Sequence, residues 1–418
     1  MEKLAIDGGA KAVTQPVPPP LHGIMDVGDE EIAAVTAVLR SQRIFRFLPG
    51  EPDEAAQLEE WYRKNCGSEY ALAVGCGGTG ALICALTGLG IGSGDEVIVP
   101  GYTYVATAAA CLSVGAIPVL AEVDESLTLD PADVERRITP HTRAIIPVHM
   151  RGVPCDMDRL MDVARRHNLL VLEDCAQANG GMYKGRMLGS IGHAGAFSLQ
   201  HYKVITAGEG GIVVTNDGNV YRRAAMKHDS AMFFWREDEN WETFAGENFR
   251  MCNMRAALAL VQLQRMPDIL QKCRGIKRRI HAALEKIEGI ECQRINCADG
   301  DCGIVAAFML PTADLARRFG EALQAEGVPA GSIYNKLIPD RHIYCYWDYV
   351  MEKRTSDPSG WPWTAARRPI EYRADMLPRT LDILGRTIQV TITQHWSDEL
   401  VDEVIAAIEK TARLIDGM

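Results

Sequence analysis

Short apolar runs alternate with amphipathic stretches between about residues 70 and 215. Most of the runs are apolar on both faces, which is typical of strands in a mainly parallel sheet covered by helices. One stretch between them has apolar residues at helical spacing, from Met157 through Leu160 to Ala164. The alternation predicts a three-layer α/β domain. The expected strands cover residues 96–99, 117–120, 144–148, 169–172, 196–199 and 212–215.

After Asn253 the pattern changes to long helices and mixed segments. Residues 254–287 predict one or two long helices, and residues 313–326 predict another. Ser397 is a candidate N-cap for a C-terminal helix. These elements predict a smaller α+β domain. We therefore expect an N-terminal arm over residues 1–30, a large domain over 31–265 and a small C-terminal domain over 266–418.

Residues 340–378 show no clear periodicity and are rich in aromatic side chains. A loop of this length in a compact protein is usually functional or disordered, and the aromatic residues favour a packed loop. We expect it to shape a substrate pocket, although its aromatic residues could merely pack. The residues in question are His342, Tyr344, Tyr346, Trp347, Tyr349, Trp361, Trp363 and Tyr372.

Composition and charge exclude several classes of protein. The chain has 418 residues, with 44 Lys and Arg against 55 Asp and Glu, so its formal net charge is −11. This acidic balance argues against a nucleic-acid binder. No apolar run approaches membrane-spanning length, and the N-terminus has no apolar core of the kind found in signal peptides. The twelve cysteines include no C-x-x-C pair, which argues against a zinc ribbon. We expect a cytoplasmic enzyme without a metal.

The strongest local signal lies between residues 195 and 211, where a strand runs into a polar loop and a glycine-rich turn returns into another strand. Ser198 and Lys203 would lie near the carboxyl ends of strands, where open α/β sheets place their ligands. A lysine in such a place can form a Schiff base if burial keeps its amine neutral. From position alone, an ordinary solvated lysine is equally compatible.

A carboxylate, Asp174, follows another predicted buried strand. It lies within residues 172–177, 29 residues before Lys203. An ionised aspartate buried there requires a cationic partner, since an unpaired buried charge is strongly destabilising. In pyridoxal phosphate enzymes such an aspartate holds the pyridine nitrogen protonated, so that the ring can accept electrons. The alternative is an aspartate that caps the next helix.

Residues 75–82 form a glycine-rich turn that opens into a helix and includes Gly78 and Thr79. Backbone N–H groups at a helix N-terminus bind phosphate, although a structural turn is equally compatible. The turn has neither the lysine of a P-loop nor the G-x-G-x-x-G pattern. These absences argue against nucleotide hydrolysis and dinucleotide binding.

Together these motifs resemble the DegT/DnrJ/EryC1/StrS family of sugar aminotransferases, which are pyridoxal phosphate enzymes. The resemblance covers nearly the whole chain, including residues 4–9, 92–97 and 100–107, and the stretch 197–211 is highly specific. It implies the aspartate-aminotransferase-like fold, PLP fold type I. In that fold a three-layer α/β large domain binds pyridoxal 5'-phosphate and a smaller α+β domain follows it.

The resemblance also implies roles for individual residues. Lys203 would hold the cofactor covalently and move the proton between the donor and acceptor carbons. Asp174 would pair with the pyridinium, and Gln177 would bind the phenolic oxygen. Tyr104 would stack on the ring, although a core aromatic residue is the alternative. The phosphate would be held by Gly78, Thr79 and Ser198, and by Asn248 of a neighbouring subunit, which implies a homodimer with active sites at the subunit interface.

In this family an amino acid, usually glutamate or glutamine, gives its amino group to the cofactor, and a keto- or aldehydo-sugar then receives it in a ping-pong reaction. Residues 198–200 and 342–352 are more similar to the branch that acts on non-nucleotide sugars, such as 8-oxo-3-deoxy-octulosonate, or on cyclitols. Candidate substrate contacts are His149, Arg151, His201, Tyr202 and Arg250. Each of these residues could equally be a structural polar residue.

Three alternatives stay open. The acceptor could be a nucleotide-linked keto-sugar. A branch of the family uses the same fold as a sugar dehydratase dependent on pyridoxal or pyridoxamine phosphate, but it carries histidine in place of Lys203. A non-catalytic regulatory module would not need Asp174, Gln177, Ser198 and Lys203 together.

Overall fold

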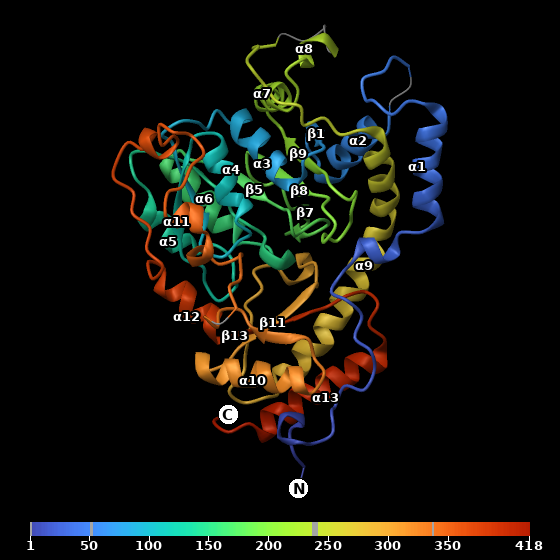
Figure 1. Ribbon diagram of the computed structural model, residues 1–418, viewed down its shortest axis with the longest axis vertical. Coiled ribbons are helices and arrows are strands. Elements are labelled where there is room, and N and C mark those ends of the chain that lie inside the picture. Colours follow the sequence, from blue (N-terminus) through green and yellow to red (C-terminus); the bar gives the residue numbers. More distant parts are fainter. Residues whose placement is uncertain (1, 51–52, 236–240, 337) are drawn as a thin grey trace.

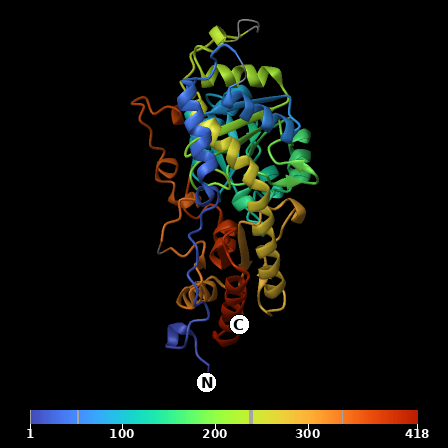
Figure 2. The same ribbon diagram turned by 90° about the vertical axis from the view of Figure 1, so that its right-hand side faces the viewer.

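The computed structural model of the chain describes residues 2–50, 53–235, 241–336 and 338–418. A seven-stranded sheet lies in the upper half of the view in Figure 1, and a four-stranded sheet lies below it. Helix α9 (Asn253–Leu284) runs from the upper half down beside the lower sheet. Both termini lie at the end of the molecule that holds the small sheet, as the two views in Figures 1 and 2 show.

The large sheet has the strand order β1-β9-β8-β5-β4-β2-β3. The strands from β8 to β3 are parallel to one another, and β9 is antiparallel to both of its neighbours. All six predicted strands are present, which confirms a mainly parallel sheet. The strands are β1 (Tyr70–Val74), β2 (Glu96–Pro100), β3 (Ile117–Ala121), β4 (Thr142–Ile145), β5 (Leu170–Asp174), β8 (Ala194–Ser198) and β9 (Gly211–Thr215).

Helices pack on this sheet and on one another. Helix α2 packs on β1 and β9, and α3 packs on β8 and β9 as well as on α4 and α7. The helical spacing that begins at Met157 is confirmed as α6, which the Asp156 side chain caps by accepting the Arg159 N–H at 3.2 Å. The helices of this part are α1 (Asp29–Ser41), α2 (Glu54–Cys66), α3 (Gly77–Gly88), α4 (Ala106–Ser113), α5 (Pro131–Arg137), α6 (Met157–His167), α7 (Gly218–His228) and α8 (Met232–Trp235).

The small sheet is antiparallel, with the order β10-β11-β13-β12. Helices α10, α12 and α13 accompany it, and Ser397 caps α13 by accepting the Leu400 N–H at 3.1 Å, as predicted. The helical stretch predicted over residues 254–287 is one helix, α9, which ends at Leu284 and has Pro267 inside it. The elements are β10 (Glu291–Cys292), β11 (Val305–Met309), α10 (Ala313–Ala325), β12 (Ala330–Ser332), α12 (Pro378–Arg386), β13 (Thr387–Thr391) and α13 (Asp398–Leu414).

The long loop at 340–378 is packed, as expected from its aromatic residues. Tyr344 and Trp347 are fully buried, and the Tyr344 hydroxyl donates to the Ala374 carbonyl at 2.7 Å. The segment contains only short helices: η5 (Tyr344–Tyr346), α11 (Asp348–Met351) and η6 (Trp363–Ala365). Other short elements are η1 (Ala5–Asp7), η2 (Gly23–Asp26), η3 (Met150–Gly152), η4 (Ala298–Gly300), β6 (Met182–Tyr183) and β7 (Arg186–Met187).

The N-terminal segment is tied to the part of the molecule that holds the small sheet. The Glu326 carboxylate accepts the backbone N–H groups of Ala5 and Ala12 at 2.7 and 2.8 Å, and it pairs with Lys410. In Figure 1 this segment then runs upward toward the large sheet. The domain division at residue 265 remains a prediction, because α9 passes through that position without a break.

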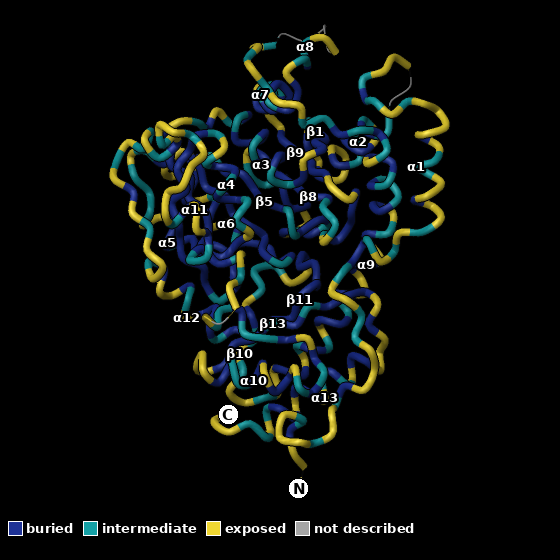
Figure 3. The backbone as a smooth tube through the Cα atoms, in the orientation of Figure 1, coloured by how far each residue is buried: buried dark blue, intermediate teal, exposed yellow. Residues whose placement is uncertain are grey.

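Buried residues concentrate in the centre of both sheets, as the dark tube in Figure 3 shows, and every residue of β2, β3, β8 and β9 is buried. Within the described part of the chain, no helix is both long enough and apolar enough to cross a membrane.

Candidate active site

A cavity of about 610 Å³ opens where β5 and β8 end and α3 begins. The part of the chain that holds the small sheet closes one side of it with Ile304, Val305 and Thr391. Another cavity, of about 690 Å³, lies along α9 and contains none of the predicted site residues. Nine predicted residues line the first cavity: Gly78, Thr79, Tyr104, Arg151, Asp174, Gln177, Ser198, Tyr202 and Lys203.

Lys203 lies on the loop that follows β8. Among the described residues its Nζ has no hydrogen-bond or ion-pair partner, and its backbone N–H donates to the Gln200 carbonyl at 3.0 Å. Burial lowers the pKa of Lys203 below its ordinary value of 10.5. The Asp174 carboxylate opposes this shift in pKa, and the Arg151 guanidinium adds to it. The site therefore favours the neutral, nucleophilic amine.

Asp174 ends β5 and is almost fully buried in the cavity wall. The Thr107 hydroxyl donates to its Oδ2 at 2.8 Å, and the Ala176 N–H donates to its Oδ1 at 3.0 Å. Burial raises the pKa of this carboxyl against both hydrogen bonds. Among the described residues it forms no ion pair, so a bound cation would stabilise its ionised form.

The start of α3 faces the same cavity. Its N-cap is Cys76, which makes no side-chain capping hydrogen bond, and the first-turn residues Gly77, Gly78 and Thr79 all line the cavity. A Cβ added to Gly78 would lie 2.9 Å from the Ser198 Cβ, so only glycine allows the helix to begin this close to the end of β8. Free N–H groups at a helix N-terminus form a site for an anion such as phosphate.

Two more predicted residues, Tyr104 and Gln177, reach the cavity from neighbouring loops. Tyr104 is 49% exposed, and its ring lies 5.6 Å from the ring of His342. The Gln177 side chain accepts the Arg151 backbone N–H at 3.0 Å through Oε1, so its Nε2 remains available as a donor. His342 comes from the aromatic loop, which therefore does contribute to the cavity.

Four predicted residues lie outside this cavity. His149 is fully buried, and the His201 ring packs edge-on against the Tyr202 ring at 5.0 Å. One guanidinium nitrogen of Arg250 pairs with Asp229 at 2.6 Å. Asn248 is exposed next to Arg250, and its backbone bridges to Asp229. The geometry of a single chain therefore offers no support for His149, His201 or Arg250 as substrate contacts.

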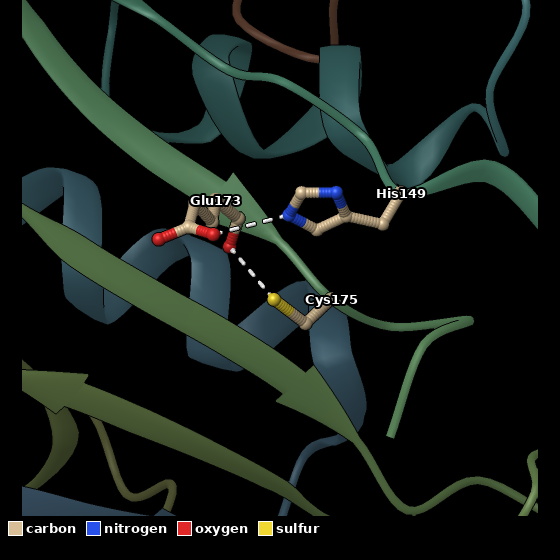
Figure 4. Close-up of side chains that lie close together, drawn as sticks. All are labelled: His149, Glu173 and Cys175. Carbon is tan, nitrogen blue, oxygen red and sulfur yellow. Dashed lines mark hydrogen bonds and ion pairs between the residues drawn. The ribbon is translucent and has the colours of Figure 1, made fainter. Parts of the chain in front are cut away.

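His149 is instead half of a buried hydrogen-bonded pair (Figure 4). Its Nδ1 accepts the Cys155 N–H at 3.1 Å, so the ring proton lies on Nε2 and is donated to the Glu173 Oε2 at 3.1 Å. Glu173 also accepts the N–H groups of Gly189, Ile191 and Gly192 at 2.6–2.9 Å. Burial raises the pKa of Glu173, but these hydrogen bonds outweigh it and lower the pKa below its ordinary value.

Cys175 is the third side chain in Figure 4, and its Sγ donates weakly to the Glu173 carbonyl at 3.9 Å. The ligand atoms of His149, Glu173 and Cys175 lie within 4.8 Å of one another. The His149 and Glu173 atoms that could bind a metal already hydrogen-bond each other. We therefore interpret the cluster as a hydrogen-bond network that fixes the end of β5.

Sequence reasoning missed several residues of the cavity. Thr107, which holds Asp174, lies inside the recognised segment 100–107 and could have been found there. Glu209 lies in the glycine-rich turn, close to Gly77. His22 comes from the N-terminal segment, where no local pattern marks it.

The polar groups that line the cavity fit pyridoxal phosphate. It combines an amine with lowered pKa, a buried carboxylate that forms no ion pair within the described residues, a free amide N–H and an uncapped helix N-terminus. These groups match the cofactor's aldehyde, pyridinium, phenolic oxygen and phosphate respectively. The fold and this cavity therefore define a pyridoxal-phosphate-dependent enzyme of fold type I.

Comparison with known proteins identifies the family. Residues 25–357 match the model of the DegT/DnrJ/EryC1/StrS aminotransferase family, so the chain belongs to this family, whose cofactor is pyridoxal 5'-phosphate. The solved structure of an aminotransferase from Psychrobacter cryohalolentis is similar, with 31% identity, a TM-score of 0.77, and coverage of 94% of this chain and 98% of that one.

Two curated relatives differ in the acceptor that their names imply. GDP-perosamine synthase from Caulobacter vibrioides is 44% identical over 51% of this chain, and the match spans only 57% of that relative's length. An L-glutamine:2-deoxy-scyllo-inosose aminotransferase from Micromonospora echinospora is 37% identical over 68% of each chain. The first name refers to a nucleotide-linked sugar and the second to a cyclitol.

Proposed function

We propose that the protein is a pyridoxal-phosphate-dependent aminotransferase that moves an amino group from glutamate or glutamine to a keto- or aldehydo-sugar. The observation that carries this proposal is the presence of Lys203 and Asp174 in one cavity with the uncapped start of α3. Family membership supports it. The presence of Lys203 argues against the dehydratase branch, which has histidine at this position.

Each residue has a task that follows from its surroundings. Bound pyridoxal phosphate supplies an aldehyde for amines and a ring that accepts electrons. Lys203 Nζ would hold the cofactor and would move a proton between the donor and acceptor carbons, which requires the neutral amine that burial favours. Asp174, oriented by the Thr107 hydroxyl, keeps the ring nitrogen protonated. Tyr104 would cover the ring, and Gln177 would donate to its phenolic oxygen.

We favour a non-nucleotide sugar, such as 8-oxo-3-deoxy-octulosonate, or a cyclitol as the acceptor. Burial lowers the pKa of both cavity histidines, His22 and His342, although Asp340 opposes the shift at His342. The lowered pKa values favour neutral rings, which suit sugar hydroxyl groups. Apart from Lys203, the described lining of the cavity offers one cation, Arg151. A nucleotide diphosphate group requires several cations or N–H donors, so this lining fits a polyhydroxylated acceptor better.

We also propose a homodimer in which Asn248 of one subunit reaches the phosphate site of the other. This proposal is supported by the exposure of Asn248 outside its own chain's cavity. A cytoplasmic location stays a prediction from the sequence.

The acceptor can be tested directly. The holoenzyme is first loaded with the amino group from glutamate and freed of excess donor, and single-turnover return of the original absorbance is then followed. We expect a keto-cyclitol or the 8-oxo sugar acid to restore the spectrum at least about tenfold faster than a GDP-linked 4-keto sugar at equal concentration. Faster return with the GDP-sugar would establish the nucleotide-linked alternative.

A further inference from the structure

Arg151 is a cavity arginine without an ion-pair partner. Its Nε is buried and has no hydrogen-bond partner, and among the described residues no carboxylate pairs with its guanidinium. A buried arginine elsewhere in the chain, Arg46, pairs with Glu59 at 2.8 Å. A buried guanidinium N–H that lacks an acceptor in a cavity wall is costly, unless a ligand accepts it.

The backbone at Arg151 is held in an uncommon conformation. Its φ and ψ are 53° and 30°, in the left-handed region, and the next residue, Gly152, is left-handed as well. The turn is fixed because Gln177 accepts the Arg151 N–H at 3.0 Å and Gly152 accepts the Cys302 N–H at 3.0 Å. A Cβ on Gly152 would lie 2.6 Å from the Cys302 Cβ. A strained turn that is held this firmly beside a cavity points to a functional constraint on its side chain.

The charge of Arg151 acts on Lys203, so the two side chains share one part of the cavity. The amino group of a donor amino acid must replace the Lys203 amine, and the donor's α-carboxylate is attached through a single carbon to that nitrogen. The carboxylate therefore has to lie within a few ångströms of the place that the Lys203 amine occupies. A planar guanidinium is the side chain best suited to bind a carboxylate with two parallel hydrogen bonds.

The cavity histidines do not compete for this role. The Gln394 Nε2 donates to Asp26 at 2.8 Å, so its Oε1 faces the Nδ1 of His22 at 3.2 Å. The Nδ1 of His22 therefore carries the proton, and its Nε2 is an acceptor. The Nδ1 of His342 lies 2.7 Å from Asp340 in the same way and donates to it. Both rings offer lone pairs, which repel carboxylates and suit hydroxyl groups.

We propose that Arg151 is the anchor for the α-carboxylate of the amino donor. This inference rests on the proposed function and adds the ligand group that one wall of the cavity recognises. It implies that simple amines without a carboxylate are poor donors, and that the amino acid and the sugar contact different polar groups of the same cavity.

The test uses the holoenzyme and three variants. Arg151→Asn removes the charge with a residue that tolerates the left-handed backbone and keeps the N–H bonded to Gln177. Arg151→Lys keeps the charge without the planar fork. Arg143→Met removes an exposed arginine of β4 and serves as a matched control. The measurements are the KM for glutamate and for the acceptor, and the dissociation constant of glutarate, a dicarboxylate that lacks the amino group, from its effect on the absorbance of the bound cofactor.

We expect Arg151→Asn to raise the KM for glutamate and the dissociation constant of glutarate by about 10- to 100-fold, with a smaller rise for Arg151→Lys and none for Arg143→Met. The KM for the acceptor should stay within about twofold of the wild type. Unchanged glutarate binding in Arg151→Asn, or a rise confined to the acceptor, would overturn the assignment. If wild-type holoenzyme reacts with no amino acid, the proposed function fails, whereas the glutarate titration still tests the carboxylate site.

Discussion

Glu173 and Asp174 are adjacent in β5, and their carboxylates lie on opposite faces of the sheet. Glu173 pairs with the fully buried His149 at 3.1 Å, whereas Asp174 accepts the Thr107 hydroxyl at 2.8 Å in the cavity wall. The His149 N–H also donates to the Asp174 carbonyl at 3.1 Å. One short segment thus fixes both the carboxylate that pairs with His149 and the carboxylate that we propose binds the cofactor, because neighbouring side chains of a strand point in opposite directions.

Asp174→Asn should lower turnover by about 100-fold or more, because the amide keeps the shape but cannot stabilise a protonated ring nitrogen. Thr107→Val removes one hydrogen bond to the same carboxylate and should lower turnover by about five- to tenfold. Steady-state rates at saturating donor and acceptor measure both effects. Equal losses in the two variants would show that the charge of Asp174 is not the decisive property.

His149→Phe and Glu173→Gln should each lower the free energy of unfolding by about 3 kcal/mol or more, since each breaks a fully buried, hydrogen-bonded pair. Urea denaturation followed by circular dichroism measures the loss. Glu135→Gln, at an exposed pair with Arg166, is the control and should change little. A loss no greater than that of the control would mean that the pair does not hold the end of β5.

The stability of the cofactor-free protein should depend on pH through Lys203. Burial lowers the pKa of Lys203 below 10.5, so between the lowered pKa and 10.5 the unfolded chain binds more protons, and stability rises with pH. The variant Lys203→Met lacks this dependence. We therefore expect the variant to be more stable than the wild type near neutral pH, by a margin that shrinks as the pH approaches 10.5.

Urea denaturation at several pH values between 7 and 10 measures this margin. Lys64→Met, at an exposed lysine near Glu60, is the control and should show no such trend. A margin that stays constant with pH would contradict a lowered pKa at Lys203.

Mixed dimers test the proposed role of Asn248. Subunits with Lys203→Ala and subunits with Asn248→Asp, each inactive alone, are unfolded together and refolded. If Asn248 serves the partner's site, each mixed dimer contains one intact site, and random mixing should restore about a quarter of wild-type activity. No recovery in a mixture that is shown to contain mixed dimers would place Asn248 in its own subunit's site, and an Asn248→Asp protein that is active alone would place Asn248 outside any site.

The sequence predicts the large sheet well because buried parallel strands are apolar on both faces. It misses β1 (Tyr70–Val74), whose two alanines have low β propensity and whose place is decided by antiparallel pairing with β9. Lys203 and Asp174 could be found because each follows a recognisable strand. His22 could not, since it reaches the cavity from the N-terminal segment through tertiary packing, whereas His342 belongs to the aromatic loop that was expected from the sequence to shape the pocket.

Polar residues close to a motif are harder to assign. His149 precedes Arg151 by two residues, yet His149 is fully buried and Arg151 lines the cavity. The left-handed turn at Arg151 and Gly152 separates their side chains, and in the sequence only Gly152 indicates a turn there.

The most direct test of the central claim is the absorbance spectrum of the purified holoenzyme during titration with glutamate and, separately, with glutamine. We expect a visible band of the lysine-bound cofactor that one donor bleaches and a keto-sugar or keto-cyclitol restores, and that is absent in Lys203→Ala. A folded protein that gains no visible band after addition of pyridoxal phosphate, or whose band no amino acid bleaches, would contradict the assignment as an aminotransferase.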